Sequence, residues 1–247
     1  MIPFNKNILV LGGSGELGSY LVLDLKAMGY SVLTPTHKEL DILNLKKADN
    51  LGHKYNTDIL INLVAWTNTL TAEDPANWNK VLDHNLWLPN YMREHYLDNQ
   101  IIFHLSTDYV YDGDTPNSKE TDLLRPWNRY GISKALCDQE LLALDHPNLY
   151  IIRTSFKPKI WKHPEAFTDI ITNADTTDVI SKLITKFIQQ LPKPGIYNIG
   201  TETKSVFDLI QRTNSHIKPA KLIDSDFKHL LKPNLTMNLN KFKELNL

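Results

Sequence analysis

The chain has 247 residues, a formal net charge of −1 at pH 7 and 42% hydrophobic residues, which is the composition of an ordinary globular protein. No block of basic residues stands out, so we expect no nucleic-acid partner. The single cysteine, Cys137, excludes an intramolecular disulfide and a cysteine-rich metal site. With no leader pattern and no apolar stretch of about 20 residues, we expect a cytoplasmic protein without a membrane partner.

The N-terminal segment predicts a strand, a tight glycine turn and a helix. An apolar run over 8–11 leads into Gly12, Gly15 and Gly18, and leucines at helical spacing follow from 16 to 28. Glycines alone would suit many α/β proteins. The strand before them and the helix after them favour a dinucleotide-binding turn, because a ligand can approach a backbone without Cβ atoms and the helix N-terminus attracts phosphate.

The second strand, predicted over 30–33, is followed by Thr36, His37 and Lys38. In dinucleotide-binding folds this strand ends at the adenosine ribose, where an acidic residue would accept the 2′-hydroxyl of NAD. No acidic residue occurs there before Glu39, and His37 and Lys38 can carry positive charge. This pattern favours NADPH as the cofactor and leaves NADH open.

The rest of the chain alternates between predicted strands and helices. Further strands are expected at 58–65, 101–105, 149–153 and 195–199, and helices in a stretch that ends near 55 and at 74–96, 130–144, 178–190 and 205–213. Pro89 should kink or divide the helix at 74–96. This alternation predicts an α/β, Rossmann-like doubly wound parallel sheet with right-handed crossovers.

Two side chains on one predicted helix indicate acid–base chemistry. Tyr130 and Lys134 are four residues apart and therefore share a helix face. A lysine ammonium a few ångströms away would lower the pKa of the phenol and make it a usable proton donor. Thr107, next to a strand end, could bind a carbonyl oxygen. Such a pair often arises by chance, but here it follows a turn suited to a nicotinamide cofactor.

These motifs resemble the extended short-chain dehydrogenases/reductases, and among them the dTDP-4-dehydrorhamnose reductase family. The resemblance is collinear from residue 8 to about 156 and rests on the segments 12–18, 40–42, 62–67, 72–73, 106–113, 130–134 and 152–155. The run Ser-Thr-Asp-Tyr-Val at 106–110 is the most specific of them. The glycine motif and the Tyr-x-x-x-Lys spacing identify only the superfamily.

The resemblance implies roles for the matched positions. The catalytic residues would be Thr107, Tyr130 and Lys134, with Tyr130 as the proton donor. The cofactor would be bound by Gly12, Ser14, Gly15, Glu16, Leu17, Thr36, His37, Asp41, Ile42, Leu63, Ala65, Thr67, Tyr130 and Lys134. The substrate would contact Thr107, Asp108, Tyr109, Phe156 and Lys232.

The implied domains are an NAD(P)-binding domain at 1–155, to which 177–200 returns, and a small substrate-binding lobe at 156–176 and 201–247. The implied activity is NAD(P)H-dependent reduction of a nucleotide-diphospho-4-keto-6-deoxy-sugar, and the resemblance also allows a homodimer. The chain departs from the family at Phe156, where tryptophan is usual, in the much shorter segment after it, and at Leu70, which replaces an acidic residue.

Two alternatives remain open. One is a nucleotide-sugar epimerase or dehydratase, although dehydratases usually carry an Asp-Glu pair where this chain has Asp108 followed by Tyr109. The other is a non-catalytic NADP-binding regulatory subunit.

Lysines at 157, 159, 162 and 232 could bind a diphosphate. The nine histidines lack metal-ligand spacing, so we expect no metal site and a structural or surface role for His104.

Overall fold

The computed structural model describes residues 2–3, 5–44, 51–95 and 100–247. Its centre is a six-stranded sheet in the order β10-β5-β4-β3-β1-β2, and every pairing within it is parallel. The strands are β1 (Asn7–Leu11), β2 (Ser31–Leu33), β3 (Ile59–Asn62), β4 (Ile101–Thr107), β5 (Leu149–Thr154) and β10 (Gly195–Ile199). Most of these strands are buried on both faces, as their continuous apolar sequences predict. The predicted doubly wound parallel sheet is confirmed.

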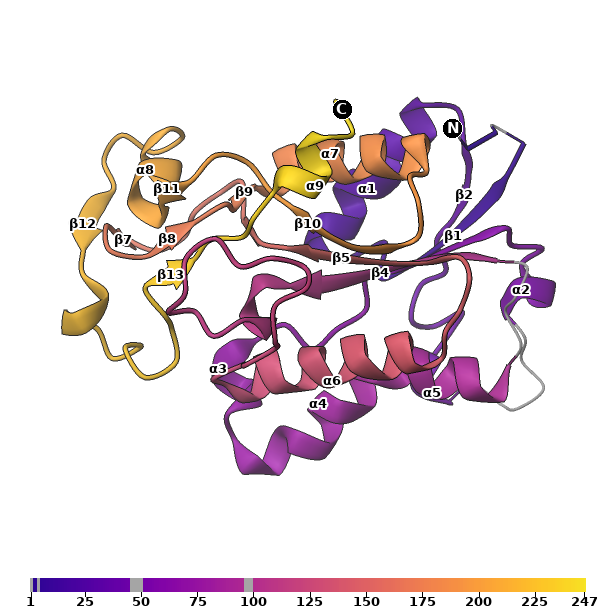
Figure 1. Ribbon diagram of the computed structural model, residues 1–247, viewed down its shortest axis with the longest axis horizontal. Coiled ribbons are helices and arrows are strands. Elements are labelled where there is room, and N and C mark those ends of the chain that lie inside the picture. Colours follow the sequence, from indigo (N-terminus) through magenta and orange to yellow (C-terminus); the bar gives the residue numbers. More distant parts are fainter. Residues whose placement is uncertain (1, 4, 45–50, 96–99) are drawn as a thin grey trace.

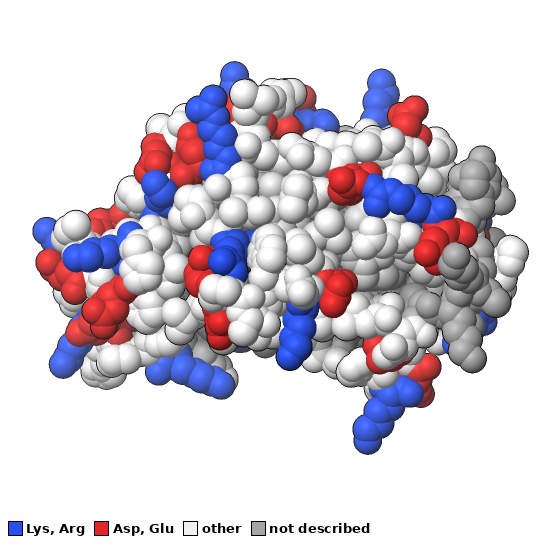
Figure 2. All heavy atoms as spheres, turned by 90° about the horizontal axis from the view of Figure 1, so that it is seen from below, with Lys and Arg blue, Asp and Glu red and all other residues white. Residues whose placement is uncertain are grey.

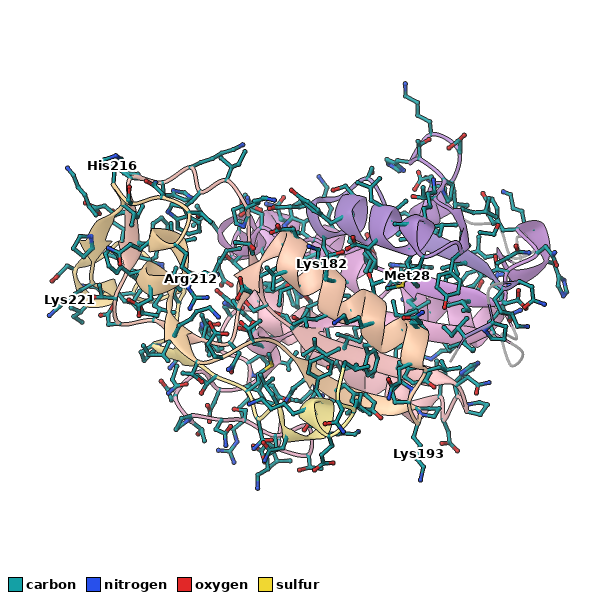
Figure 3. The ribbon with its side chains drawn as sticks, turned by 90° about the horizontal axis from the view of Figure 1, so that it is seen from above. Met28, Lys182, Lys193, Arg212, His216 and Lys221 are labelled. Atoms are coloured by element: carbon teal, nitrogen blue, oxygen red, sulfur yellow. The ribbon has the colours of Figure 1, made fainter. Side chains whose placement is uncertain are left out.

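Helices cover both faces of this sheet (Figure 1). One face carries α1 (Glu16–Ala27) and α7 (Thr177–Gln190), which lie side by side in Figure 3, where Lys182 marks α7 and Met28 the end of α1. The other face carries α4 (Trp78–Asn85), α5 (Trp87–Glu94) and α6 (Arg129–Ala143), with the short helices α2 (Leu51–Lys54) and α3 (Thr69–Ala72) nearby. A separate apolar cluster fills the space on each side of the sheet.

A smaller lobe extends beyond the carboxyl ends of the main strands. It contains β7 (Glu165–Phe167), β8 (Ile171–Thr172), β11 (Lys204–Ser205), α8 (Val206–Gln211), β12 (Lys218–Ala220) and β13 (Asn234–Leu235). The short parallel pair of β6 (Phe156–Lys157) and β9 (Asp175–Thr176) connects it to the sheet. The Ser205 side chain caps α8 by accepting the backbone N–H of Asp208. The last helix, α9 (Asn240–Lys243), returns to the main sheet, where Phe242 packs into the core.

The predicted helix at 74–96 is divided, as expected, but ahead of its proline. Asp74 caps a 3₁₀ turn at Pro75–Asn77, α4 ends at Asn85, and α5 begins at Trp87. Pro89 lies in the first turn of α5, where a missing backbone N–H leaves no helix hydrogen bond unmade. Residues 45–50, within the helical stretch expected to end near 55, lie outside the described residues.

The predicted strand at 58–65 ends early, at Asn62. There the Asn62 side-chain oxygen accepts the backbone N–H of Val64 at 3.1 Å, and Asn85 Oδ1 accepts the N–H of Trp66 at 2.7 Å. Side chains thus replace the next strand as partners of the backbone, and the chain turns away from the sheet.

Charged side chains of both signs alternate over the face that carries α4 and α6 (Figure 2). This distribution agrees with the small net charge of the sequence. Within the described ranges, no helix combines the length and the apolar character that crossing a bilayer requires.

One buried ion pair joins the sheet to α6. Arg153 of β5 is 1% exposed, and its Nε donates to Asp138 Oδ2 at 2.9 Å. The guanidinium also donates to the Tyr111 hydroxyl at 3.0 Å and to the Glu120 carbonyl at 3.2 Å. Removing one member of such a pair leaves a buried charge uncompensated, which costs far more than losing a surface pair.

We therefore expect Asp138→Asn to lower the free energy of unfolding by about 3–5 kcal/mol. The matched control on the same helix is Glu140→Gln, because Glu140 pairs with Arg93 at the surface. Loss of this surface pair should lower the free energy of unfolding by less than about 1 kcal/mol. Urea unfolding of both variants measures the difference, and equal losses would contradict the role given to the buried pair.

Candidate functional site

A cleft of about 540 Å³ opens at the carboxyl ends of the main strands. The order of the sheet reverses direction at β1, and ligands bind at such switch points in parallel α/β sheets. The loops after β1 and β3, the end of β4, the start of α6 and the segment after β5 form the walls of this cleft.

The glycine turn forms one wall and requires its glycines. Gly12 has a positive φ of 81°, and a Cβ on Gly18 would lie 2.2 Å from the Gly12 carbonyl oxygen. Gly15 is the N-cap of α1 and supplies no side chain to the first-turn N–H groups of the helix. These N–H groups line the cleft at Glu16 and Leu17 and are suited to a phosphate.

Three contacts fix the start of α6 and thereby place Tyr130 in the cleft. Asn128 caps the helix by accepting the Gly131 N–H at 2.7 Å, and Glu73 accepts the Arg129 N–H at 2.6 Å. A Cβ on Gly131 would lie 2.4 Å from the Tyr109 carbonyl oxygen, so only glycine allows this close approach.

The hydroxyls of Thr107 and Tyr130 lie together at the end of β4. Thr107 Oγ1 donates to Asp108 Oδ1 at 3.0 Å. Burial raises the pKa of Tyr130 above its usual value, a hydrogen bond with Thr107 opposes the rise, and the charges of Asp108 and Asp138 add to it. Tyr130 is therefore a protonated phenol at neutral pH and can donate its proton.

Lys134 is held in the interior by contacts with two residues of β4. Its side chain is 1% exposed, Nζ donates to the Leu105 carbonyl at 2.7 Å, and the same atom lies 3.0 Å from His104 Nε2. Burial lowers the pKa of Lys134. The expectation that Lys134 lowers the pKa of Tyr130 is wrong for this structure, because desolvation raises that pKa and the amine is directed at other partners.

Asp108 brings a second acid into the cleft. Its carboxyl is 1% exposed, and Oδ2 has no hydrogen-bond partner within the part of the chain that the structure describes. Burial raises its pKa to about 6, against the opposing effects of the Lys157 charge and hydrogen bonds from Thr107 and Ser155. The free oxygen is available to a ligand hydroxyl.

The structure brings most of the predicted site residues together. Those that line the cleft are Gly12, Ser14, Gly15, Glu16, Leu17, Leu63, Ala65, Thr67, Thr107, Asp108, Tyr109, Tyr130, Lys134 and Phe156. Five others do not line it: Thr36, His37, Asp41, Ile42 and Lys232.

The residues outside the cleft have local partners instead. The backbone N–H and hydroxyl of Thr36 both donate to Glu39, and His37 is 80% exposed and 3.8 Å from Asp41. Lys232 pairs with Asp114 at 2.7 Å.

Several lining residues escaped the sequence argument. Ser106 and Thr154 lie at the carboxyl ends of neighbouring strands, and their buried hydroxyls have no partner in the described ranges. Their position at the ends of predicted strands was the feature of the sequence that could have identified them.

Of the lysines considered for a diphosphate, Lys157 lines the cleft, whereas Lys159 pairs with Asp178 at 2.9 Å. The described residues hold no group of three potential metal ligands.

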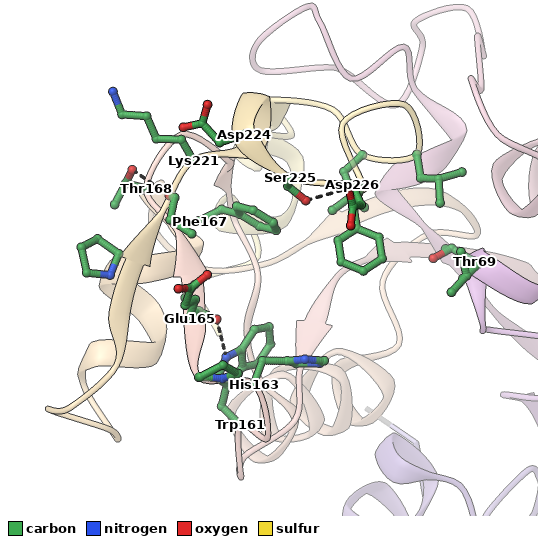
Figure 4. A pocket seen from close by; sticks show the side chains of 18 of the residues that line it. Thr69, Trp161, His163, Glu165, Phe167, Thr168, Lys221, Asp224, Ser225 and Asp226 are labelled. Carbon is green, nitrogen blue, oxygen red and sulfur yellow. Dashed lines mark hydrogen bonds between the residues drawn. The ribbon is translucent and has the colours of Figure 1, made fainter.

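A second cavity, of about 1100 Å³, lies between the lobe and α3 (Figure 4). Thr69 lines both cavities, so the two adjoin. Trp161 and His163 form one side, with ring centroids 5.1 Å apart, and Phe167 lies on another. The aromatic rings and the volume suit a flat ring system connected to a ligand in the first cleft.

Comparisons with known proteins agree with this geometry. A dTDP-4-dehydrorhamnose reductase from Aggregatibacter actinomycetemcomitans is 35% identical over 152 residues, which cover 60% of this chain and 51% of that protein. The spore coat polysaccharide biosynthesis protein SpsK from Bacillus subtilis is 35% identical over 156 residues, which cover 60% of this chain and 52% of that protein. The matched part of the chain thus spans about half the length of these curated relatives.

Among solved structures, a dTDP-4-dehydrorhamnose reductase from Bacillus anthracis in complex with NADP superposes with a TM-score of 0.82 at 21% identity. The match covers 99% of this chain and 93% of that one. It shows that the two share a fold. Residues 6–186 match the family model described as the RmlD substrate binding domain. Since this match covers most of the chain, the protein belongs to that family.

Proposed function

We propose that this protein is an NAD(P)H-dependent reductase that converts the 4-keto group of a nucleotide-diphospho-4-keto-6-deoxy-sugar to an alcohol. One observation carries the proposal: the hydroxyls of Thr107 and Tyr130 lie together in a cleft that is also lined by a glycine turn and the N-terminus of α1. The names of the curated relatives and the NADP bound to a similar structure support it.

The residues present fit a nicotinamide dinucleotide. The backbone at Gly12 and Gly15 and the first turn of α1 would hold the pyrophosphate, since the N-cap places no side chain over the free N–H groups. Ala65, Thr67 and Lys134 would bind the nicotinamide end. When bound, the cofactor supplies a hydride. NADPH is proposed over NADH, because no acidic residue follows β2 before Glu39 and a similar structure holds NADP.

The reaction needs one proton for each hydride. As the hydride bonds to the carbonyl carbon, the π electron pair moves onto the oxygen, and hydrogen bonds from Thr107 and Tyr130 stabilise the developing charge. Tyr130 then gives its proton to the alkoxide, and the phenolate regains a proton from solvent. A raised phenol pKa suits this direction, because the donor must be protonated when the hydride arrives.

The two adjoining cavities suit the two ends of such a substrate. The sugar would occupy the cleft beside Thr107, where Asp108 Oδ2 can accept a sugar hydroxyl. The nucleoside would occupy the larger cavity, with its base against the rings of Trp161 and Phe167. Lys157, beside the cleft, is the lysine placed to meet the diphosphate.

We expect Tyr130→Phe to abolish the oxidation of NADPH in the presence of dTDP- or UDP-4-keto-6-deoxyglucose. The loss should be at least about 100-fold, because a general acid typically contributes that much or more. NADPH binding, measured by calorimetry, should be retained, because the phenol hydroxyl lies beside the carbonyl site. Optical assays with both nucleotides and with NADH in parallel identify the preferred pair.

Tyr55→Phe is the control, since this tyrosine does not line the cleft. Turnover that survives in Tyr130→Phe would contradict the assigned proton donor. NADPH binding without turnover in the unaltered protein would favour the regulatory-subunit alternative. A changed sugar stereocentre or loss of water without net NADPH oxidation would favour an epimerase or dehydratase.

We expect Asp108→Asn to stabilise the protein at neutral pH. The pKa of Asp108 in the folded protein, about 6, lies above the usual 3.8, so folding favours the protonated carboxyl. The stability that Asp108 contributes is present below pH 3.8 and is lost as the pH rises through about 6. Removing the ionisable group should therefore raise the free energy of unfolding by about 3 kcal/mol at pH 7.

The gain in the free energy of unfolding should disappear near pH 4. Urea unfolding of both proteins at a series of pH values measures this change. Asp83→Asn, on an exposed position of α4, serves as the control and should show no such pH dependence. A constant gain at every pH would show that ionisation of the buried carboxyl is not its source.

A further inference from the structure

An acidic side chain lies at the turn where a phosphate would bind. Glu16 is the first residue of α1, is exposed and lines the cleft next to Gly15. A helix N-terminus attracts anions, and its first N–H groups have no partner within the helix. A carboxylate at this position competes with a phosphate for these N–H groups and repels it by its charge. A phosphate therefore binds more tightly when the carboxylate is held away from the turn.

A buried hydroxyl on the neighbouring helix holds this carboxylate. Thr177 is the first residue of α7 and is fully buried, and its Oγ1 donates to Glu16 Oε1 at 3.1 Å. Within the described ranges, no other hydrogen-bond donor contacts the Glu16 carboxylate. Because α7 lies beside α1 (Figure 3), the bond directs the carboxylate toward α7 instead of its own helix N-terminus.

The Thr177 hydroxyl has a second acceptor within reach. Its Oγ1 lies 3.0 Å from the Lys157 carbonyl oxygen in β6. A hydroxyl has one proton and can donate it to one acceptor at a time. Hydrogen bonds to an ionised acceptor are the stronger ones, so the carboxylate is favoured. The carbonyl remains as an acceptor when Glu16 is replaced by a neutral residue, and the buried hydroxyl is then not left without a partner.

Two lysines at this junction act on other carboxyl groups. Lys159 Nζ lies 2.9 Å from Asp178 Oδ2, and the charge of Lys157 acts on Asp108 in the cleft. Neither lysine therefore supplies the cation that would hold Glu16, and the restraint depends on the neutral hydroxyl of α7.

We propose that Thr177 is a positioning residue for the anion-binding turn: its hydroxyl holds the Glu16 carboxylate against α7 and leaves the first-turn N–H groups of α1 free for a phosphate. This inference rests on the proposed function, in which the phosphate is the pyrophosphate of NADPH. Without the hydroxyl, the exposed carboxylate can turn toward its own helix N-terminus and oppose the incoming phosphate.

The first test is the Kd of NADPH for Thr177→Val, measured by calorimetry at low ionic strength. We expect binding to be weaker by about two- to fivefold. The effect is one of charge, so the ratio of the two Kd values should approach one near 1 M salt, where the Debye length is about 3 Å. An effect that does not depend on salt would overturn the proposal.

Two variants control for the loss of a buried hydroxyl. Thr177→Ser keeps the donor and should keep the Kd of the unaltered protein. Thr185→Val makes the same substitution at another buried position of α7, where the hydroxyl donates to the Ser181 carbonyl at 2.8 Å. It should leave the Kd unchanged, and weakening equal to that of Thr177→Val would overturn the proposal.

The second test removes the charge. In a protein that carries Glu16→Gln, Thr177→Val should no longer weaken the binding of NADPH, because no carboxylate is left to restrain. Weakening that persists in this double variant would show that Thr177 acts through β6 instead, and would overturn the proposal.

Inorganic pyrophosphate is the second probe, since it tests the turn without the rest of the cofactor. If pyrophosphate shows the expected pattern and NADPH does not bind, the proposed cofactor is wrong and the role of Thr177 stands. If neither binds to the unaltered protein, the anion site and the role of Thr177 are both overturned. Urea unfolding of each variant verifies that it is folded.

Discussion

The structure depends on the close approach of α6 to the ends of β4 and β5. Gly131 permits backbone contact with the Tyr109 carbonyl, and the buried pair of Asp138 and Arg153 fixes the opposite part of the helix. Lys134 lies between these two attachments, and Tyr130 immediately precedes the first of them. A helix held at both ends on a parallel sheet can keep two side chains in register with a strand end, which is what an acid–base site needs.

The cleft, by contrast, leaves polar atoms without partners. Asp108 Oδ2 and the hydroxyls of Ser106 and Thr154 are buried with none among the described residues. Such groups cost stability unless a ligand satisfies them. The apolar clusters on both faces of the sheet offset that cost, so unsatisfied groups can persist at the strand ends where a substrate would bind.

Much of this could be predicted from the sequence, because the signals are local. The apolar strands, the glycine turn and the cap of α8 follow from residue type and spacing. The division of the helix at 74–96 was predictable from Pro89, but its position was not, because a proline is tolerated in a first helical turn. The early end of β3 depends on side chains from Asn62 and Asn85, whose partners only the tertiary structure reveals.

The direction of a pKa shift was the least predictable property. A Tyr-x-x-x-Lys spacing places two side chains on one helix face, but it does not say how deeply either is buried or which atom the lysine meets. Here the Lys134 amine lies 3.0 Å from Nε2 of His104, for which the sequence suggested a structural or surface role, and desolvation dominates the pKa of Tyr130. A phenol whose pKa is raised by burial holds its proton at neutral pH and can donate it. Burial in the interior, which the motif does not reveal, therefore sets the direction in which the pKa of this phenol is shifted.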